Sequence, residues 1–142
     1  MITLANESHI DDIYKLLCIL ENQELNWNHF KQCYLNSLNN PDIHYYIYIC
    51  NNKVVGFLSF YIHHYLHHNS NTGEIVELVV NPEYRNQKIG ENLLKFIENL
   101  AREKSLEEIE LSTSTYRKNA HRFYERNGYL MNHYNYTKKI NH

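Results

Sequence analysis

Helical spacing of apolar residues occurs in four stretches of the chain, and each stretch predicts an amphipathic helix. These stretches are residues 10–20, 28–36, 90–104 and 119–126. Ser8 precedes the first stretch as a helix cap would, and Asp11 stands where a capping box usually has glutamate. Asn127-Gly128 follows the last stretch, and glycine at this place is typical of a helix end.

Six apolar runs rich in β-branched and aromatic residues predict strands. They are residues 1–5, 45–50, 54–62, 74–80, 108–112 and 129–137. A turn at Asn51-Asn52-Lys53 joins the second and third runs into a hairpin, and the polar residues 63–73 are expected to form a loop near the functional site. The order of helices and strands predicts an α/β fold, with a mixed central sheet flanked by about four helices. We expect a single domain of residues 1–142.

Charge and composition exclude several classes of function. The 142 residues include 14 lysines and arginines against 16 aspartates and glutamates, so the net charge is −2 and a broad nucleic-acid surface is not expected. No segment reaches the roughly 18 apolar residues of a membrane span, so we expect a soluble, cytoplasmic protein without membrane contact. The three cysteines form no CxxC pair, which argues against a zinc site or a disulfide framework.

A strand, a polar loop and a helix start follow one another between Ile75 and Gly90. The apolar run stops at Pro82, and the polar loop then leads into the third predicted helix. The first N–H groups of a helix have no partner within it, and its dipole adds partial positive charge, so such a loop favours a phosphate group. Asn86 tolerates the left-handed conformation that an N–H nest requires, and Lys88 adds a positive charge. An ordinary solvated loop is the alternative.

This loop and the segment Asn119–Tyr129 resemble the motifs of the Gcn5-related N-acetyltransferases (the GNAT family). Further segments resemble the aminoalkylphosphonate N-acetyltransferases of that family: Leu66–Asn69, Gly73–Val80, Glu110–Thr113, Ala120–Tyr124 and Tyr136–Lys138. The resemblance implies the GNAT fold and acetyl-CoA as co-substrate. It also implies acetyl transfer to the primary amine of a small molecule bearing an anionic group, by direct attack in a ternary complex. Small domains of this family are often dimers, so a homodimer is possible.

The coenzyme site follows from the same resemblance. Arg85, Ile89 and Gly90 match the family's loop, whereas Lys88 occupies the place of its first glycine. The residues assigned to coenzyme binding are Leu78, Val79, Val80, Arg85, Asn86, Gln87, Lys88, Ile89, Gly90, Glu91 and Asn119. Asn119 would bond the pantetheine arm, and a role as a helix N-cap is the alternative or an addition.

Two residues are candidates for proton transfer. An alkylammonium cannot attack a thioester until its proton, with a pKa near 10, is removed. Glu77 interrupts an apolar run, so burial should raise its pKa into a useful range for a base. Glu77 on a solvent face, paired with a cation, is the alternative, and Glu74 is a second candidate base. By resemblance, Tyr124 would donate a proton to the leaving thiolate; otherwise it is a core aromatic residue.

The acceptor site is assigned to His67, His68, Glu74 and Ser112. Four histidines, at positions 63, 64, 67 and 68, cluster where an acceptor would enter, and they could bind a phosphonate or a divalent metal. They could equally be an accident of a surface loop, and we predict no metal. The acidic residues leave a polyamine, an aminoglycoside or a protein amine open as acceptors. A coenzyme-binding module without turnover also remains open.

Overall fold

The computed structural model describes residues 1–141. The chain forms two compact units, Met1–Leu111 and Ser112–His142. The first unit contains a five-stranded sheet in the order β1-β2-β3-β4-β5. Its strands are β1 (Ile2–Leu4), β2 (Ile43–Cys50), β3 (Lys53–His63), β4 (Thr72–Val80) and β5 (Ile109–Leu111). The pairs β1–β2, β2–β3 and β3–β4 are antiparallel, whereas β5 runs parallel to β4, which gives the predicted mixed sheet.

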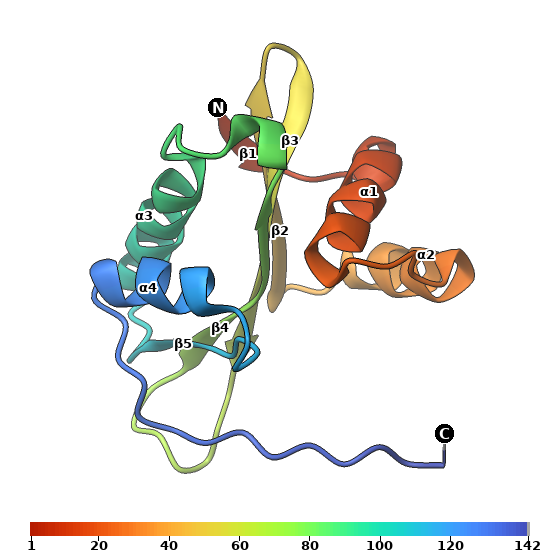
Figure 1. The fold of residues 1–142 in the computed structure, drawn as a ribbon. Helices are drawn as coiled ribbons and strands as arrows, with labels where there is room; N and C mark the ends of the chain where they lie inside the picture. Colours follow the sequence, from red (N-terminus) through yellow and green to blue (C-terminus); the bar gives the residue numbers. More distant parts are fainter. Residues whose placement is uncertain (142) are drawn as a thin grey trace. The chain divides into compact units, whose positions relative to one another are not determined.

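Three helices of the first unit cover the two faces of this sheet (Figure 1). They are α1 (Ile10–Glu21), α2 (Trp27–Ser37) and α3 (Ile89–Glu103). Figure 1 shows α1 and α2 on one face and α3 on the other. Two short 3-10 turns, η1 (Glu7–His9) and η2 (Pro82–Tyr84), precede α1 and the loop that leads to α3.

Each face of the sheet has its own apolar contacts. On the α1/α2 face, Phe57 of β3 and Val79 of β4 pack in a buried cluster with Ile13 and Leu16 of α1 and Tyr34 of α2. On the other face, α3 buries five apolar side chains: Ile89, Leu93, Leu94, Ile97 and Ala101. This apolar stripe explains why the helical spacing of the sequence located α3 within a residue of each end.

The second unit contains α4 (Lys118–Arg126). Gly128, with φ +90, ends this helix as predicted. The N–H of Tyr129 donates to the Tyr124 carbonyl (3.0 Å) and the N–H of Gly128 to the Glu125 carbonyl (3.1 Å), so carbonyls of the last turn are satisfied.

Two local predictions are wrong. Residues 129–137 form no strand in the described chain, and Leu130 and Tyr134 are 82% and 90% exposed. A strand is stabilised by a hydrogen-bonded neighbour, which weak local alternation cannot supply. The cap near the first helix is Asn6 rather than Ser8, because Asn6 starts η1: its side chain accepts from Ser8 N–H (2.9 Å) and its own N–H donates to His9 Nδ1 (3.0 Å).

Candidate active site

A β-bulge places the acidic residues of β4 on one face of the sheet. Ser59 of β3 pairs with Glu77, but the next residue, Phe60, pairs with Ile75, so Val76 is the extra residue. Without the extra residue, positions 74 and 77 would point to opposite faces. Because of it, the partners of Glu77 and Glu74 are Ser59 and Tyr61, two residues apart on β3 and on the α1/α2 face with Phe57.

Glu77 is a partly buried carboxylic acid on this face. Burial is the main cause that raises the pKa of Glu77, and repulsion by Glu21 of α1 and Glu74 adds to it. The hydroxyl of Ser59 donates to Glu77 Oε1. This hydrogen bond lowers the pKa of Glu77, because a hydrogen bond to a carboxylate favours the charged form. A raised pKa makes this carboxylate a stronger base than an ordinary one, which suits a general base.

The pairing between the two parallel strands ends two residues before Glu77. Pairing between β4 and β5 covers Gly73–Ile75 and Ile109–Leu111 in the described chain. The second half of β4, which contains Leu78, Val79 and Val80, therefore pairs with β3 alone. Backbone groups on the side of β4 that faces away from β3 can bind an extended ligand as an additional strand would.

The polar loop before α3 has the backbone of an anion site. Asn86 and Lys88 both have left-handed φ values, 68 and 62 degrees, and both side chains are exposed. Lys88 is the N-cap of α3, and its own side chain makes no capping hydrogen bond. The N–H groups at the start of α3 can therefore bind a phosphate. Ile89 is itself buried, so it can contribute only through its backbone.

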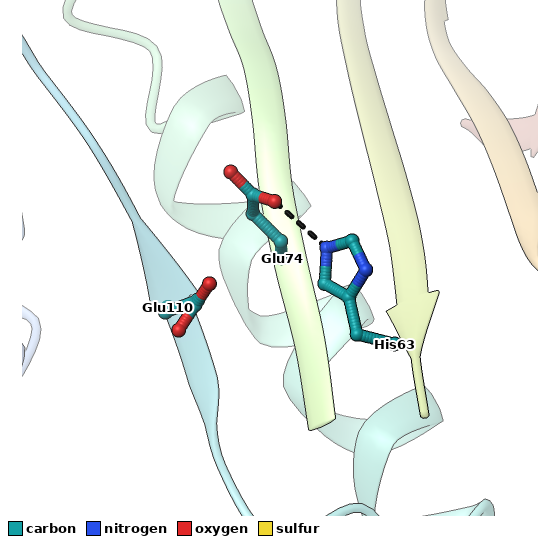
Figure 2. A group of neighbouring side chains, drawn as sticks. All are labelled: His63, Glu74 and Glu110. Carbon is teal, nitrogen blue, oxygen red and sulfur yellow. Dashed lines mark hydrogen bonds and ion pairs between the residues drawn. The ribbon is translucent and has the colours of Figure 1, made fainter. Parts of the chain in front are cut away.

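Three of the four histidines lie around Tyr65, whose ring centroid is 4.8, 5.3 and 6.0 Å from those of His63, His67 and His68. The polar partners of the histidines nevertheless differ. His63 Nε2 lies 2.8 Å from Glu74 Oε1, whereas His64 bonds Asp42 and His68 bonds Glu107. His63 instead forms a group with Glu74 and Glu110 on three neighbouring strands (Figure 2). Each of the three offers one ligand atom, and these atoms lie within 4.8 Å of one another, so this group could hold a divalent cation.

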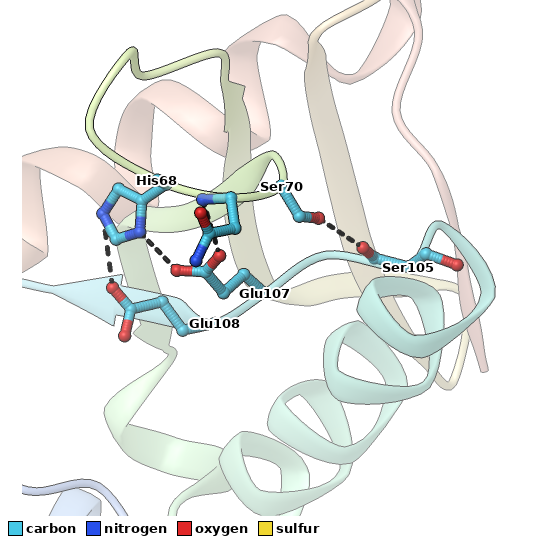
Figure 3. Close-up of polar contacts among 6 residues, drawn as sticks. His68, Ser70, Ser105, Glu107 and Glu108 are labelled. Carbon is cyan, nitrogen blue, oxygen red and sulfur yellow. Dashed lines mark hydrogen bonds and ion pairs between the residues drawn. The ribbon is translucent and has the colours of Figure 1, made fainter.

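His68 ties the loop between β3 and β4 to the segment that precedes β5 (Figure 3). Its Nδ1 lies 2.5 Å from Glu107 Oε2 and its Nε2 lies 3.7 Å from Glu108. The hydrogen bond to Glu107 is the main cause that raises the pKa of His68, and the same bond lowers the pKa of Glu107. The N–H of Asn69 also donates to Glu107 Oε1 (3.0 Å). His68 is thus held by carboxylates, whereas His67 is exposed beside it.

The remaining predicted residues belong to the second unit. Within it, burial raises the pKa of Tyr124 to about 12, with Arg117 acting in the opposite direction, so this phenol keeps its proton at neutral pH. Asn119 lies inside α4 rather than at its N-cap, which is Arg117, and its Oδ1 accepts from Arg122 (2.8 Å). Ser112 is exposed.

Three residues of the first unit that contact predicted site residues had no predicted role: Ser59, Glu107 and Glu110. Ser59 could have been found by the reasoning that found Glu77, because it is a polar residue inside an apolar run. Glu107 and Glu110 lie in an acidic stretch of ordinary appearance, and only the pairing of distant segments brings them to His68 and Glu74.

The chain belongs to the acetyltransferase (GNAT) family, because the family model matches residues 9–129. It is therefore an acyltransferase. It is 41% identical over 136 residues to the aminoalkylphosphonate N-acetyltransferase of Salmonella typhimurium, a match that covers 96% of this chain and 88% of that protein.

Solved structures agree with the fold. A transcriptional regulator from Bacillus halodurans has a TM-score of 0.90 at 20% identity, over 99% of both chains. An aminoglycoside N-acetyltransferase in complex with CoA has a TM-score of 0.87 at 15% identity, over 99% of this chain and 94% of the other. In the described chain, no helix is both long and apolar enough to cross a bilayer.

Proposed function

We propose that this chain transfers the acetyl group of acetyl-CoA to the primary amine of a small molecule that carries an anionic group, with an aminoalkylphosphonate as the best candidate. The observation that carries the proposal is the position of Glu77. This partly buried acid with a raised pKa lies on β4, two residues from the end of the pairing between β4 and β5. A proton acceptor therefore lies beside backbone that can hold an extended thioester.

Acetyl-CoA would bind along β4 and the loop that follows it. The backbone of Leu78, Val79 and Val80 would pair with the amides of pantetheine. The diphosphate would lie against the N–H groups between Arg85 and Glu91. Two observations support this assignment: Asn86 and Lys88 adopt left-handed φ values, and the side chain of the N-cap residue Lys88 makes no capping hydrogen bond. Asn119 of the second unit is assigned to the pantetheine arm by family resemblance.

The reaction needs two proton movements and no covalent enzyme intermediate. Glu77 takes a proton from the acceptor ammonium, directly or through water. The amine nitrogen then attacks the thioester carbonyl carbon, the new C–N bond forms, and the C–S bond breaks. Tyr124 donates its phenolic proton to the departing thiolate, and solvent restores the starting protonation states. Holding both substrates together supplies much of the acceleration.

The acceptor class is inferred from the curated relative, whose name specifies an aminoalkylphosphonate. Carboxylates on the α1/α2 face, Glu74 and Glu77 among them, would attract the ammonium end of such a molecule. They would repel its phosphonate unless a cation lies between them, and the group of His63, Glu74 and Glu110 could hold one. The same acidity favours the alternative of a cationic acceptor such as a polyamine or an aminoglycoside.

A panel of amines tests this proposal. CoA release is followed with a thiol reagent for aminoalkylphosphonates, for alkylamines of equal length without the phosphonate, and for polyamines and aminoglycosides, each with and without a chelator. We expect the highest kcat/KM for an aminoalkylphosphonate. A polyamine or an aminoglycoside at the top of the panel would reverse the acceptor class. Tight acetyl-CoA binding without release of CoA for any amine would favour a binding module.

A matched pair of variants tests the coenzyme loop. Lys88→Glu reverses a charge beside the proposed diphosphate, whereas Lys53→Glu makes the same change at the start of β3. We expect Lys88→Glu to weaken acetyl-CoA binding about tenfold by calorimetry, because one opposite charge becomes a like charge near the diphosphate. Lys53→Glu should bind as the unmodified protein does. Equal affinities for the two variants would move the diphosphate away from this loop.

A further inference from the structure

Ser59 is a buried hydroxyl inside an apolar strand. It lies between Leu58 and Phe60 of β3, and all three residues are at most 1% exposed. A hydroxyl in such surroundings costs free energy unless it forms hydrogen bonds. Its contacts therefore indicate why a polar residue is present at this position.

Both hydrogen bonds of the Ser59 side chain involve Glu77. The Ser59 hydroxyl donates to Glu77 Oε1, and Ser59 Oγ accepts from the Glu77 N–H at 2.9 Å. One side chain thus binds the carboxylate and the backbone of the same residue. These two contacts restrict the rotation of the Glu77 side chain relative to its own strand.

The bulge explains why the backbone bond is needed. At the extra residue, Val76, the regular ladder between β3 and β4 is interrupted, and a bulge leaves backbone groups without their usual cross-strand partners. The Glu77 N–H follows directly and donates to a side chain. Ser59 therefore satisfies the backbone at the bulge and holds the carboxylate that the bulge directs to the α1/α2 face.

We propose that Ser59 is a positioning residue for the general base: it fixes one orientation of the Glu77 carboxylate and stabilises its charged form. This rests on the proposed function of Glu77. Three other titratable groups act on Glu77 or respond to it: Glu21 of α1, Glu74 of β4 and Tyr61 of β3. Glu21 and Glu74 repel its negative charge, as burial also disfavours it, so the hydroxyl of Ser59 opposes all three effects.

Ser59→Ala tests the inference through the pH dependence of the reaction. Without the donated hydrogen bond, the charged form of Glu77 is less stable, so the acidic limb of the kcat/KM profile should move upward by about one pH unit. On the plateau, kcat should fall several-fold because the carboxylate is less well oriented, whereas the KM for acetyl-CoA should stay the same. Ser59→Cys keeps a weak donor of similar shape and should lie between the two proteins.

Thr72→Val is the matched control. The hydroxyl of Thr72 is also fully buried on β4, and it has no hydrogen-bond partner among the described residues. Removing it deletes a buried hydroxyl without touching Glu77, so the acidic limb should not move. If Ser59 is merely structural, Ser59→Ala will lower the melting temperature and leave the limb where it was, and the inference is then overturned.

Carbon-13 NMR of the Glu77 carboxyl group separates this inference from the proposed function. Ser59→Ala should raise the titration midpoint of Glu77 whether or not Glu77 is the base. An unmoved midpoint overturns the role of Ser59 and leaves the proposed function intact. If the midpoint moves as expected but Glu77→Gln retains the activity and the acidic limb, the proposed base fails instead. Should Ser59→Ala not fold, the same midpoint measured in Ser59→Cys decides.

Discussion

Gly73→Ala should destabilise the protein far more than alanine at other glycines. A Cβ built on Gly73 would lie 2.0 Å from Cζ of Phe60 and 2.7 and 2.9 Å from two further ring atoms. Phe60 is fully buried, so its ring has no open space to move into. Overpacking a core costs about 1–3 kcal/mol, and three ring contacts below 3 Å place this substitution at the upper end, about 3 kcal/mol.

Two other glycines give a graded comparison. A Cβ on Gly56 would meet Ile89, Tyr48 and Leu93 at 3.2 to 3.3 Å, so small shifts relieve the contact and we expect a cost of about 1 kcal/mol. Gly128 has open space but φ +90, so alanine there should cost about 1–2 kcal/mol through backbone strain alone.

Urea unfolding followed by far-UV circular dichroism measures these differences. At about 4 °C for each kcal/mol, Gly73→Ala should also lower the melting temperature by about 12 °C. Placing Gly73→Ala in a Phe60→Leu background removes the ring, so the cost of the alanine should there fall below about 1 kcal/mol. If Gly73→Ala costs no more than Gly56→Ala, or costs the same with and without the ring, the packing argument is refuted.

The remaining predictions concern the site. Glu77→Gln should lower kcat/KM by about 10²–10⁴-fold and flatten the acidic limb of its pH profile, because the amide cannot accept the ammonium proton; an unchanged limb would point to Glu74 or a histidine. Tyr124→Phe should lower kcat tenfold or more with little change in acetyl-CoA affinity by calorimetry, and equal rates would remove Tyr124 from the mechanism. Glu107→Gln should lower the melting temperature most at pH values above the lowered pKa of Glu107 and below the raised pKa of His68, because both groups are charged there. Its effect should fade as the pH rises through the raised pKa of His68, because neutral histidine loses the ion pair, so a constant difference from pH 6 to 9 would contradict the tie between the two segments.

Local patterns predicted the helices and the first five strands because each element satisfies its own periodicity. The apolar stripe of α3 and the turn at Asn51-Asn52-Lys53 are examples that need no information from distant residues. The strand expected at residues 129–137 does not form, because weak alternation does not specify a neighbouring strand to pair with.

The candidate site shows the same division between local and distant information. Glu77 was identified because a carboxylate in an apolar run is a local anomaly, and its pKa is indeed raised by burial. The bulge at Val76 depends on how β3 pairs with β4, so the placement of Glu74 on the same face could not be predicted. His68 and Glu107 are 39 positions apart, and no local pattern links them. Within the predicted cluster, the rings of His63, His67 and His68 pack around Tyr65, whereas the carboxylate partners of His63, His64 and His68 all differ.

Asparagine takes over much of the conformational role of glycine in this chain. The sequence has four glycines, yet seven other described residues adopt positive φ, and five of them are Asn22, Asn51, Asn52, Asn86 and Asn141. Asparagine reaches this conformation with less freedom to lose on folding than glycine has. Asn86, which follows Arg85, therefore supplies a left-handed turn in the polar loop without glycine, with a φ close to those of the hairpin residues Asn51 and Asn52. A motif search that insists on glycine in this loop would overlook chains of this kind.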